Sequence, residues 1–111
     1  RDRAGNLHRA KIPLDCIAYQ MGESTQVRTG GTVRATPHCV RAAYSLPEQP
    51  IHRATFAVFM QPSHDEPLDV PATISDEGRA GISADIPSWK EGQDFNAFTQ
   101  ETLKKYYGDS S

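Results

Sequence analysis

The chain has 111 residues, a formal net charge of −2 and a pI near 6.1. It therefore has room for one domain and lacks the excess of positive charge that draws a protein to nucleic acid or to an anionic membrane. No apolar run approaches the roughly 20 residues of a membrane span, and no signal-like stretch opens the sequence. We accordingly expect neither nucleic acid nor a membrane as a partner.

The start of the sequence suggests that a part is missing. The chain opens at Arg1, and Gly5-Asn6 has the composition of a hairpin turn. A hairpin needs a strand before its turn, and too few residues precede Gly5 to form one. We expect the chain to be the C-terminal part of a longer polypeptide.

The two cysteines, Cys16 and Cys39, lie in runs typical of strands and lack the spacing of a metal site. We expect both to be buried, reduced thiols. Unpaired cysteines of this kind are typical of a cytoplasmic protein, which is the location that we predict.

The first part of the chain contains four segments with the apolar content or alternation typical of strands. They are residues 7–12, 15–21, 33–42 and 53–61. Residues 23–29 favour a short helix, and Gly30-Gly31 a turn after it. Pro37 indicates an edge position or a bulge in the third strand, and residues 44–51 are expected to form a loop.

Residues 53–61 have the clearest strand pattern. Arg53 and Thr55 would leave the same face of an extended backbone, and that face then becomes apolar, as the wall of a pocket does. The opposite face is wholly hydrophobic and comprises Ala54, Phe56, Val58 and Met60. Without partner strands this face would be exposed, so we expect the isolated chain to be marginally stable.

The rest of the chain has a different composition. Residues 63–91 are rich in Pro, Asp, Glu and Ser and predict mainly surface loop, with a helical turn near residues 75–80. A final helix is expected over about residues 94–107, with Asp94 as its N-cap and Gly108 after its end. Its buried face would comprise Phe95, Phe98, Thr102 and Tyr106.

Three polar side chains suggest a binding site. The guanidinium of Arg53, with the Thr55 hydroxyl beside it, suits a carboxylate. The imidazole of His38, in the third strand-like segment, suits a metal. These residues predict half of a metal-plus-carboxylate site, provided that His38 and Arg53 face one cavity. Taken alone, the pattern predicts part of a β-sandwich or barrel with a polar pocket.

Four motifs follow one another in an order that carries a resemblance. They are Met21-Gly22-Glu23, Thr29-Gly30-Gly31, Ala35-Thr-Pro-His38-Cys-Val-Arg41, and Arg53-Ala-Thr55 with Phe59-Met-Gln-Pro62. The set resembles the C-terminal half of the double-stranded β-helix, or jelly roll, of the 2-oxoglutarate/Fe(II)-dependent dioxygenases of the isopenicillin N synthase-like group. The resemblance implies a mostly β fold, with residues 1–62 as a partial β-helix core that lacks its N-terminal half. Residues 63–111 would be a C-terminal extension with one helix.

On this resemblance, His38 would be the distal iron ligand, and Arg53 and Thr55 would bind the distal carboxylate of 2-oxoglutarate. The implied cofactor is Fe(II) and the implied co-substrate is 2-oxoglutarate. The intact enzyme would oxidise a small organic substrate, which it would bind through the missing N-terminal half. No residue of this chain is expected to be catalytic.

The sequence departs from that family in two ways. The family's first two iron ligands form a His-x-Asp pair, which is not in this sequence and would lie before residue 1. We therefore expect the chain to be inactive on its own. The separation of His38 and Arg53, 15 residues, is longer than usual for the family, and the excess lies in the loop 44–51.

Two alternatives of another class stay open. One is a non-catalytic, cupin-like β-roll binding module that keeps a pocket without a working metal, and the other is an inactive structural fragment. A His-x-Asp pair upstream of Arg1 would favour the enzyme. The other histidines, His8, His52 and His64, and the arginines Arg28, Arg34 and Arg41 are expected to be solvated.

Overall fold

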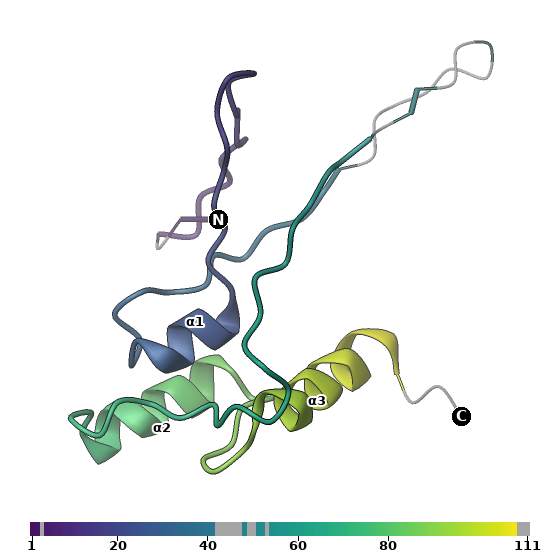
Figure 1. The fold of residues 1–111 in the computed structure, drawn as a ribbon. Coiled ribbons are helices and arrows are strands. Elements are labelled where there is room, and N and C mark those ends of the chain that lie inside the picture. The colour runs from purple at the N-terminus through teal and green to yellow at the C-terminus, as the bar shows by residue number, and fades with distance from the viewer. Residues whose placement is uncertain (3, 42–47, 49–50, 53, 109–111) are drawn as a thin grey trace.

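The computed structural model describes residues 1–2, 4–41, 48, 51–52 and 54–108. It contains three helices, α1 (Glu23–Arg28), α2 (Asp76–Asp85) and α3 (Phe95–Tyr107), which gather at one end of the molecule (Figure 1). The described residues form no strand, and their β pairing consists of one isolated antiparallel bridge between Pro67 and Asp94. None of the described helices is long and apolar enough to cross a membrane.

The chain divides into three regions that differ in structure. We call residues 22–34 and 62–108 the helical body. The described residues of 1–21 form an N-terminal excursion and those of 35–61 a central excursion, both of which extend away from the helices (Figure 1). The Cα radius of gyration is 17.2 Å, against about 13 Å for a compact domain of this length.

Helix α1 begins after Gly22 and ends where the sequence predicts. Its first turn carries Glu23 and its last turn Arg28, so both charges are favourable for the helix dipole. Gly30 and Gly31 follow with φ values of +60° and +80°, a conformation that other residues rarely adopt. A Cβ on Gly30 would also lie 2.4 Å from Cδ1 of Ile74, so the turn packs tightly on the segment before α2.

Helix α2 is longer than the single turn that the sequence predicts. Ser75 caps it, its hydroxyl accepting a hydrogen bond from the Gly78 amide at 3.2 Å. Gly78 and Gly81 weaken the intrinsic helix preference of this segment. Packing compensates for the glycines, because Ile82 of α2 and Ile86 directly after it are buried in the core.

Helix α3 has the ends expected from the sequence. The carboxylate of Asp94 accepts a hydrogen bond from the Ala97 amide at 2.7 Å, and the Gly108 amide bonds back to the carbonyl of Lys104 at 2.9 Å. The predicted buried face is correct only for its first half. Phe95 and Phe98 are buried, whereas Tyr106 is 64% exposed.

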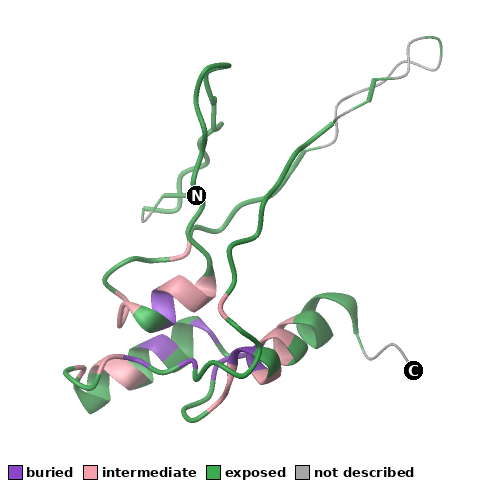
Figure 2. Cartoon of the chain, in the orientation of Figure 1, coloured by how far each residue is buried: buried purple, intermediate pink, exposed green. Residues whose placement is uncertain are grey.

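A single hydrophobic core holds the helical body together (Figure 2). It consists of Val27, Leu68, Val70, Ile82, Ile86, Trp89, Phe95 and Phe98. The Trp89 indole N–H donates to the Leu68 carbonyl at 2.7 Å, which satisfies the one polar atom of that buried ring. Most of these residues belong to segment 63–91. Most of that segment is non-helical, as predicted, but the prediction of surface loop missed its contribution to the core.

The prediction of a mostly β fold with a jelly-roll core is also wrong. The structure has three helices, and no sheet forms among the residues it describes. The described residues of the strand-like segments do avoid the helical conformation, as their β-branched and aromatic residues favour. A sheet also needs partner strands, and the described excursions do not pair into one.

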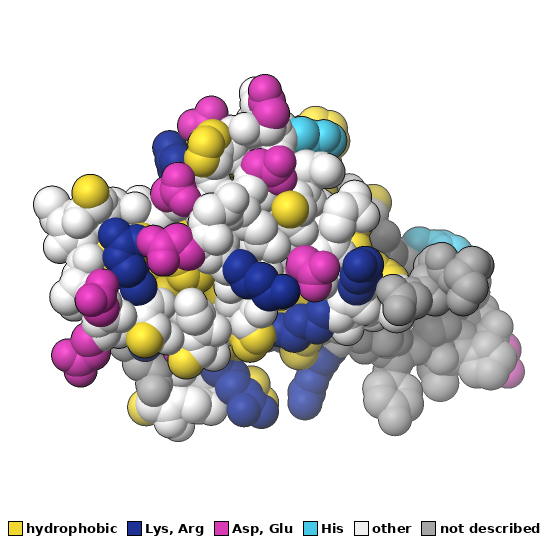
Figure 3. Space-filling view, turned by 90° about the horizontal axis from the view of Figure 1, so that it is seen from below, with side chains coloured by type: hydrophobic (Ala, Val, Ile, Leu, Met, Phe, Trp, Pro, Cys, Tyr) yellow, Lys and Arg dark blue, Asp and Glu magenta, His cyan; other side chains and the backbone are white. Residues whose placement is uncertain are grey.

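The chain exposes far more surface than a compact protein of its mass. Its accessible area is 9683 Å², against about 6,100 Å² for a compact monomer of 12.2 kDa. Phe56, Val58 and Met60 are 94%, 72% and 78% exposed, so the apolar face predicted for residues 53–61 is indeed uncovered. Figure 3 shows apolar side chains also among interspersed acidic and basic ones on one face of the molecule.

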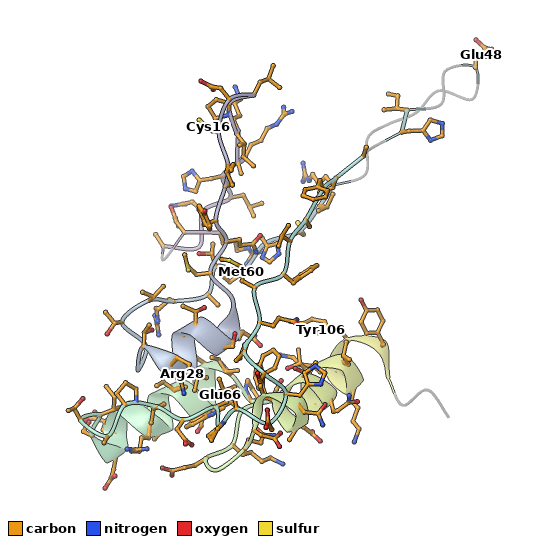
Figure 4. All side chains as sticks on the ribbon, viewed as in Figure 1. Cys16, Arg28, Glu48, Met60, Glu66 and Tyr106 are labelled. Carbon is orange, nitrogen blue, oxygen red and sulfur yellow. The ribbon has the colours of Figure 1, made fainter. Side chains whose placement is uncertain are left out.

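Both cysteines are free and exposed, so the prediction of buried thiols was wrong. Cys16 lies far out on the N-terminal excursion (Figure 4). Cys39 lies on the central excursion, one residue after His38. No described part of either excursion covers these thiols.

Candidate functional site

His38 lies on the central excursion, close to where that excursion leaves the helical body. Its Nδ1 lies 3.0 Å from the carbonyl oxygen of Thr36, and its Nε2 lies 2.7 Å from the side-chain nitrogen of Gln20. The same Gln20 nitrogen lies 2.6 Å from Nδ1, so the amide lies over the ring and not in line with the in-plane bonding direction of either nitrogen. A neutral imidazole fits the contact with Thr36 if Nδ1–H donates to the Thr36 carbonyl. Nε2 is then the atom with a lone pair for a metal.

The exposed ring of His38 borders a cavity of about 930 Å³. The cavity lies between the roots of the two excursions and the helices α1, α2 and α3. Its polar lining includes Gln20, Glu23, Arg34, His38 and Asp85. Its volume falls within the range of small-molecule sites, which is roughly 300–1,000 Å³.

A polar junction joins α1, α2 and the root of the central excursion beside this cavity. Gln26 of α1 is 4% exposed, and its side-chain N–H donates to Oδ2 of Asp85 at 3.1 Å. Its side-chain oxygen accepts from the backbone N–H of Ala35 at 2.8 Å. The guanidinium of Arg34 donates to the same Asp85 oxygen at 2.5 Å. We call these four residues the Gln26–Asp85 junction.

The predicted carboxylate-binding pair is placed only in part. Thr55 is exposed on the central excursion, and it is not among the described residues that line the cavity at His38. Arg53 lies outside the described residues. The prediction that Arg53 and His38 face one cavity therefore stays a prediction.

The described residues do not assemble an iron site. In this part of the chain no three His, Cys, Asp or Glu side chains come close enough to hold a metal ion. His38 is one donor, whereas a non-haem iron centre of the 2-His-1-carboxylate type needs three. The donor set of the described chain thus does not fit Fe(II) without ligands from elsewhere.

A second cluster of ionisable groups lies at the N-terminal excursion. His8 Nε2 lies 2.7 Å from Oδ2 of Asp2, and Asn6 donates to the same carboxylate from its side chain and its backbone. The hydrogen bond from His8, followed by those from Asn6, lowers the pKa of Asp2 from 3.8 to about 2. His8 is exposed, as predicted, but it has a carboxylate partner.

The sequence interpretation missed the residues of the junction. Arg34 was expected to be solvated, yet it pairs with Asp85 across 51 positions of sequence. Arg28 was also expected to be solvated, but it donates to the Pro67 carbonyl at 3.0 Å and lies 3.6 Å from Glu66 (Figure 4). One signal was present in the sequence. Asp85 ends α2, where a carboxylate is unfavourable for the helix dipole, so a partner for this carboxylate elsewhere in the chain could have been expected.

Comparison with known proteins adds no relative. A scan against models of protein families, a search of curated proteins and a search of solved structures each found no match to this chain.

Proposed function

We propose that the chain supplies part of the site of a non-haem Fe(II)/2-oxoglutarate-dependent oxygenase. In this proposal His38 is one iron ligand, and Arg53 with Thr55 binds the distal carboxylate of 2-oxoglutarate. The remaining iron ligands come from outside the described residues. The observation that carries the proposal is that His38 borders a cavity of about 930 Å³.

One feature of the structure and one of the sequence support this role. His38 is exposed, and the contact of its Nε2 is with an uncharged amide that a metal can displace. The order of the four sequence motifs links His38 to Arg53 and Thr55, whose side chains combine a bidentate donor with a hydroxyl. The oxidation itself requires groups that this chain does not hold, and the role proposed for its residues is to bind and orient.

The test uses the intact polypeptide and measures 2-oxoglutarate consumption together with succinate release. Arg53→Ala should raise the 2-oxoglutarate concentration at half-maximal rate about tenfold to a hundredfold, because a hydrogen bond between charged groups is lost. Arg41→Ala is the matched control, since Arg41 is an exposed arginine of the same excursion with no proposed role. An unchanged 2-oxoglutarate dependence in Arg53→Ala would refute the assignment.

A second candidate function is favoured by the surface that the chain leaves uncovered. The accessible area of 9683 Å² exceeds the compact expectation by roughly 3,600 Å². A non-catalytic structural piece, whose excursions pack against the rest of a longer polypeptide, would use this surface. Such packing needs no metal and no 2-oxoglutarate.

Hydrogen exchange of the intact polypeptide tests the second candidate. Amides of the excursions should then be protected to within about tenfold of those in the helical body, because packing closes them to solvent. Fast exchange at residues 54–60, with slow exchange in α2 and α3, would contradict it. Protected excursions together with no binding of Co(II) or 2-oxoglutarate would favour this candidate over the oxygenase.

A further inference from the structure

We propose that Asp85 is a positioning residue: through Gln26 and Arg34 it sets the direction in which the segment bearing His38 leaves the helical body. The inference extends the proposed function, because it states what holds the metal-binding imidazole against the cavity. The effect of Asp85 on the position of the His38 segment follows from contacts between described residues alone.

Asp85 sets the orientation of the Gln26 side-chain amide. A carboxylate accepts hydrogen bonds and does not donate them, so Asp85 draws the NH₂ end of the amide toward itself. The amide oxygen then faces the opposite way, where it accepts from Ala35 N–H at 2.8 Å. Because Gln26 is 4% exposed, water cannot easily replace either partner. Asp85 thus orients the Gln26 amide that binds the backbone of Ala35, although Asp85 itself does not bond to Ala35.

Asp85 also binds Arg34, the residue before Ala35. Its guanidinium donates to the same Asp85 oxygen at 2.5 Å, so one carboxylate holds the Arg34 side chain directly and the Ala35 amide through Gln26. Thr29 adds a third fixed point, since its hydroxyl accepts from the Val33 amide at 3.1 Å. The excursion is therefore attached over residues 33–35, immediately before it leaves the body.

The chain limits the distance from Ala35 to the imidazole. His38 follows Ala35 by three residues, which span at most about 10 Å when fully extended. A change in the direction of the chain at Ala35 therefore moves His38 relative to the cavity by several ångströms. Two other contacts also hold this segment: the Gln20 side chain contacts the His38 ring, and the amino group of Arg1 donates to the Pro37 carbonyl at 2.8 Å.

The stability of α2 does not account for an aspartate at position 85. It is the last residue of α2, whose last turn carries no basic residue. A negative charge there is unfavourable for the helix dipole, and alanine would be a better helix residue. The carboxylate is accounted for by its contacts with Gln26 and Arg34.

The test measures the direction of the segment that bears His38, in protein without metal. Spin labels are placed on the native, exposed Cys39 and on α3 through Lys104→Cys, with Cys16→Ser removing the other thiol. In Asp85→Ala we expect the distribution of distances between the labels to become about twofold wider, because the anchored residues can now reorient. The unfolding midpoint of the same protein is recorded alongside.

Glu91→Ala is the matched control. It removes one carboxylate and one ion pair, that of Glu91 with Arg79 at 2.7 Å, at a site away from the junction. Its label distribution should equal that of the parent protein. An unchanged distribution in Asp85→Ala, or equal broadening in Glu91→Ala, would overturn the proposal.

A second variant keeps the proposal testable if Asp85→Ala does not fold. Gln26→Met removes the amide, keeps the side-chain volume and leaves the Arg34–Asp85 pair in place. It should broaden the distribution as well, and a distribution as narrow as that of the parent would contradict the inference. The outcome is separate from the proposed function: a broadened distance distribution, together with an intact polypeptide that binds no Co(II) at His38, would refute the metal role and leave the positioning role of Asp85 unaffected.

Discussion

The helical body buries most of its large apolar side chains, whereas the described residues of the two excursions leave similar side chains exposed. All eight residues of the core lie in the helical body. Among the large apolar residues that are exposed, six lie on each excursion, from Leu7 to Met21 and from Val40 to Met60. An amphipathic helix can bury its stripe against a neighbour of the same short chain. An extended segment needs both a strand beside it and a layer on its face, and the described residues provide neither to the excursions.

The largest expected difference between the regions is in stability. Trp89→Ala should lower the free energy of unfolding by about 3–5 kcal/mol, because it empties the core and removes the bond to the Leu68 carbonyl. Urea denaturation followed by circular dichroism of the helices measures the change.

Phe56→Ala is the matched truncation on the central excursion. Phe56 is 94% exposed, so its loss should change the free energy of unfolding by less than about 0.5 kcal/mol. Comparable losses for both variants would mean that the excursion packs as the body does, and the contrast between the regions would fail.

A smaller effect is expected at the start of α3. Asp94→Ala removes the acceptor of the Ala97 amide and should lower the free energy of unfolding by about 1 kcal/mol. Asp94→Ser keeps a capping oxygen and should lose only a few tenths of a kcal/mol on the same principle. Equal losses in the two variants would show that the cap does not stabilise this helix.

The smallest effect concerns pH and is confined to the N-terminal excursion. Hydrogen bonds from His8 and Asn6 lower the pKa of Asp2 to about 2, below its usual 3.8. A lowered carboxylate pKa means that the turn is stabilised above about pH 4 and that the contribution is lost as the pH falls through about 2. The chemical shifts of the Asn6 amide should follow this transition, while those of α2 and α3 should not. In Asp2→Asn the transition should vanish, and its persistence would assign it to another group.

As with the fold, one part of the candidate site was singled out from the sequence and another part was missed. His38 was predicted as a metal ligand from the sequence, and that role stays a prediction; the structure puts the residue beside a cavity. The Gln26–Asp85 junction was missed, because its bond between side chains joins positions 59 residues apart and no local pattern reports such a contact. The pairing of His38 with Arg53 stays a prediction, since Arg53 is outside the described residues.

The sequence by itself determined where α1 begins and where α3 begins and ends. Asp94 and Gly108 mark α3, and Gly30-Gly31 ends the turn after α1, because caps and positive φ angles depend on the residue and its immediate neighbours. Tertiary structure decided which apolar residues are buried and whether extended segments pair. Leu68 and Trp89 lie in a stretch whose composition resembles a surface loop, and they are buried because helices from both sides of the sequence close over them. Burial and strand pairing depend on partners far along the chain, and a local pattern carries no information about whether those partners are present.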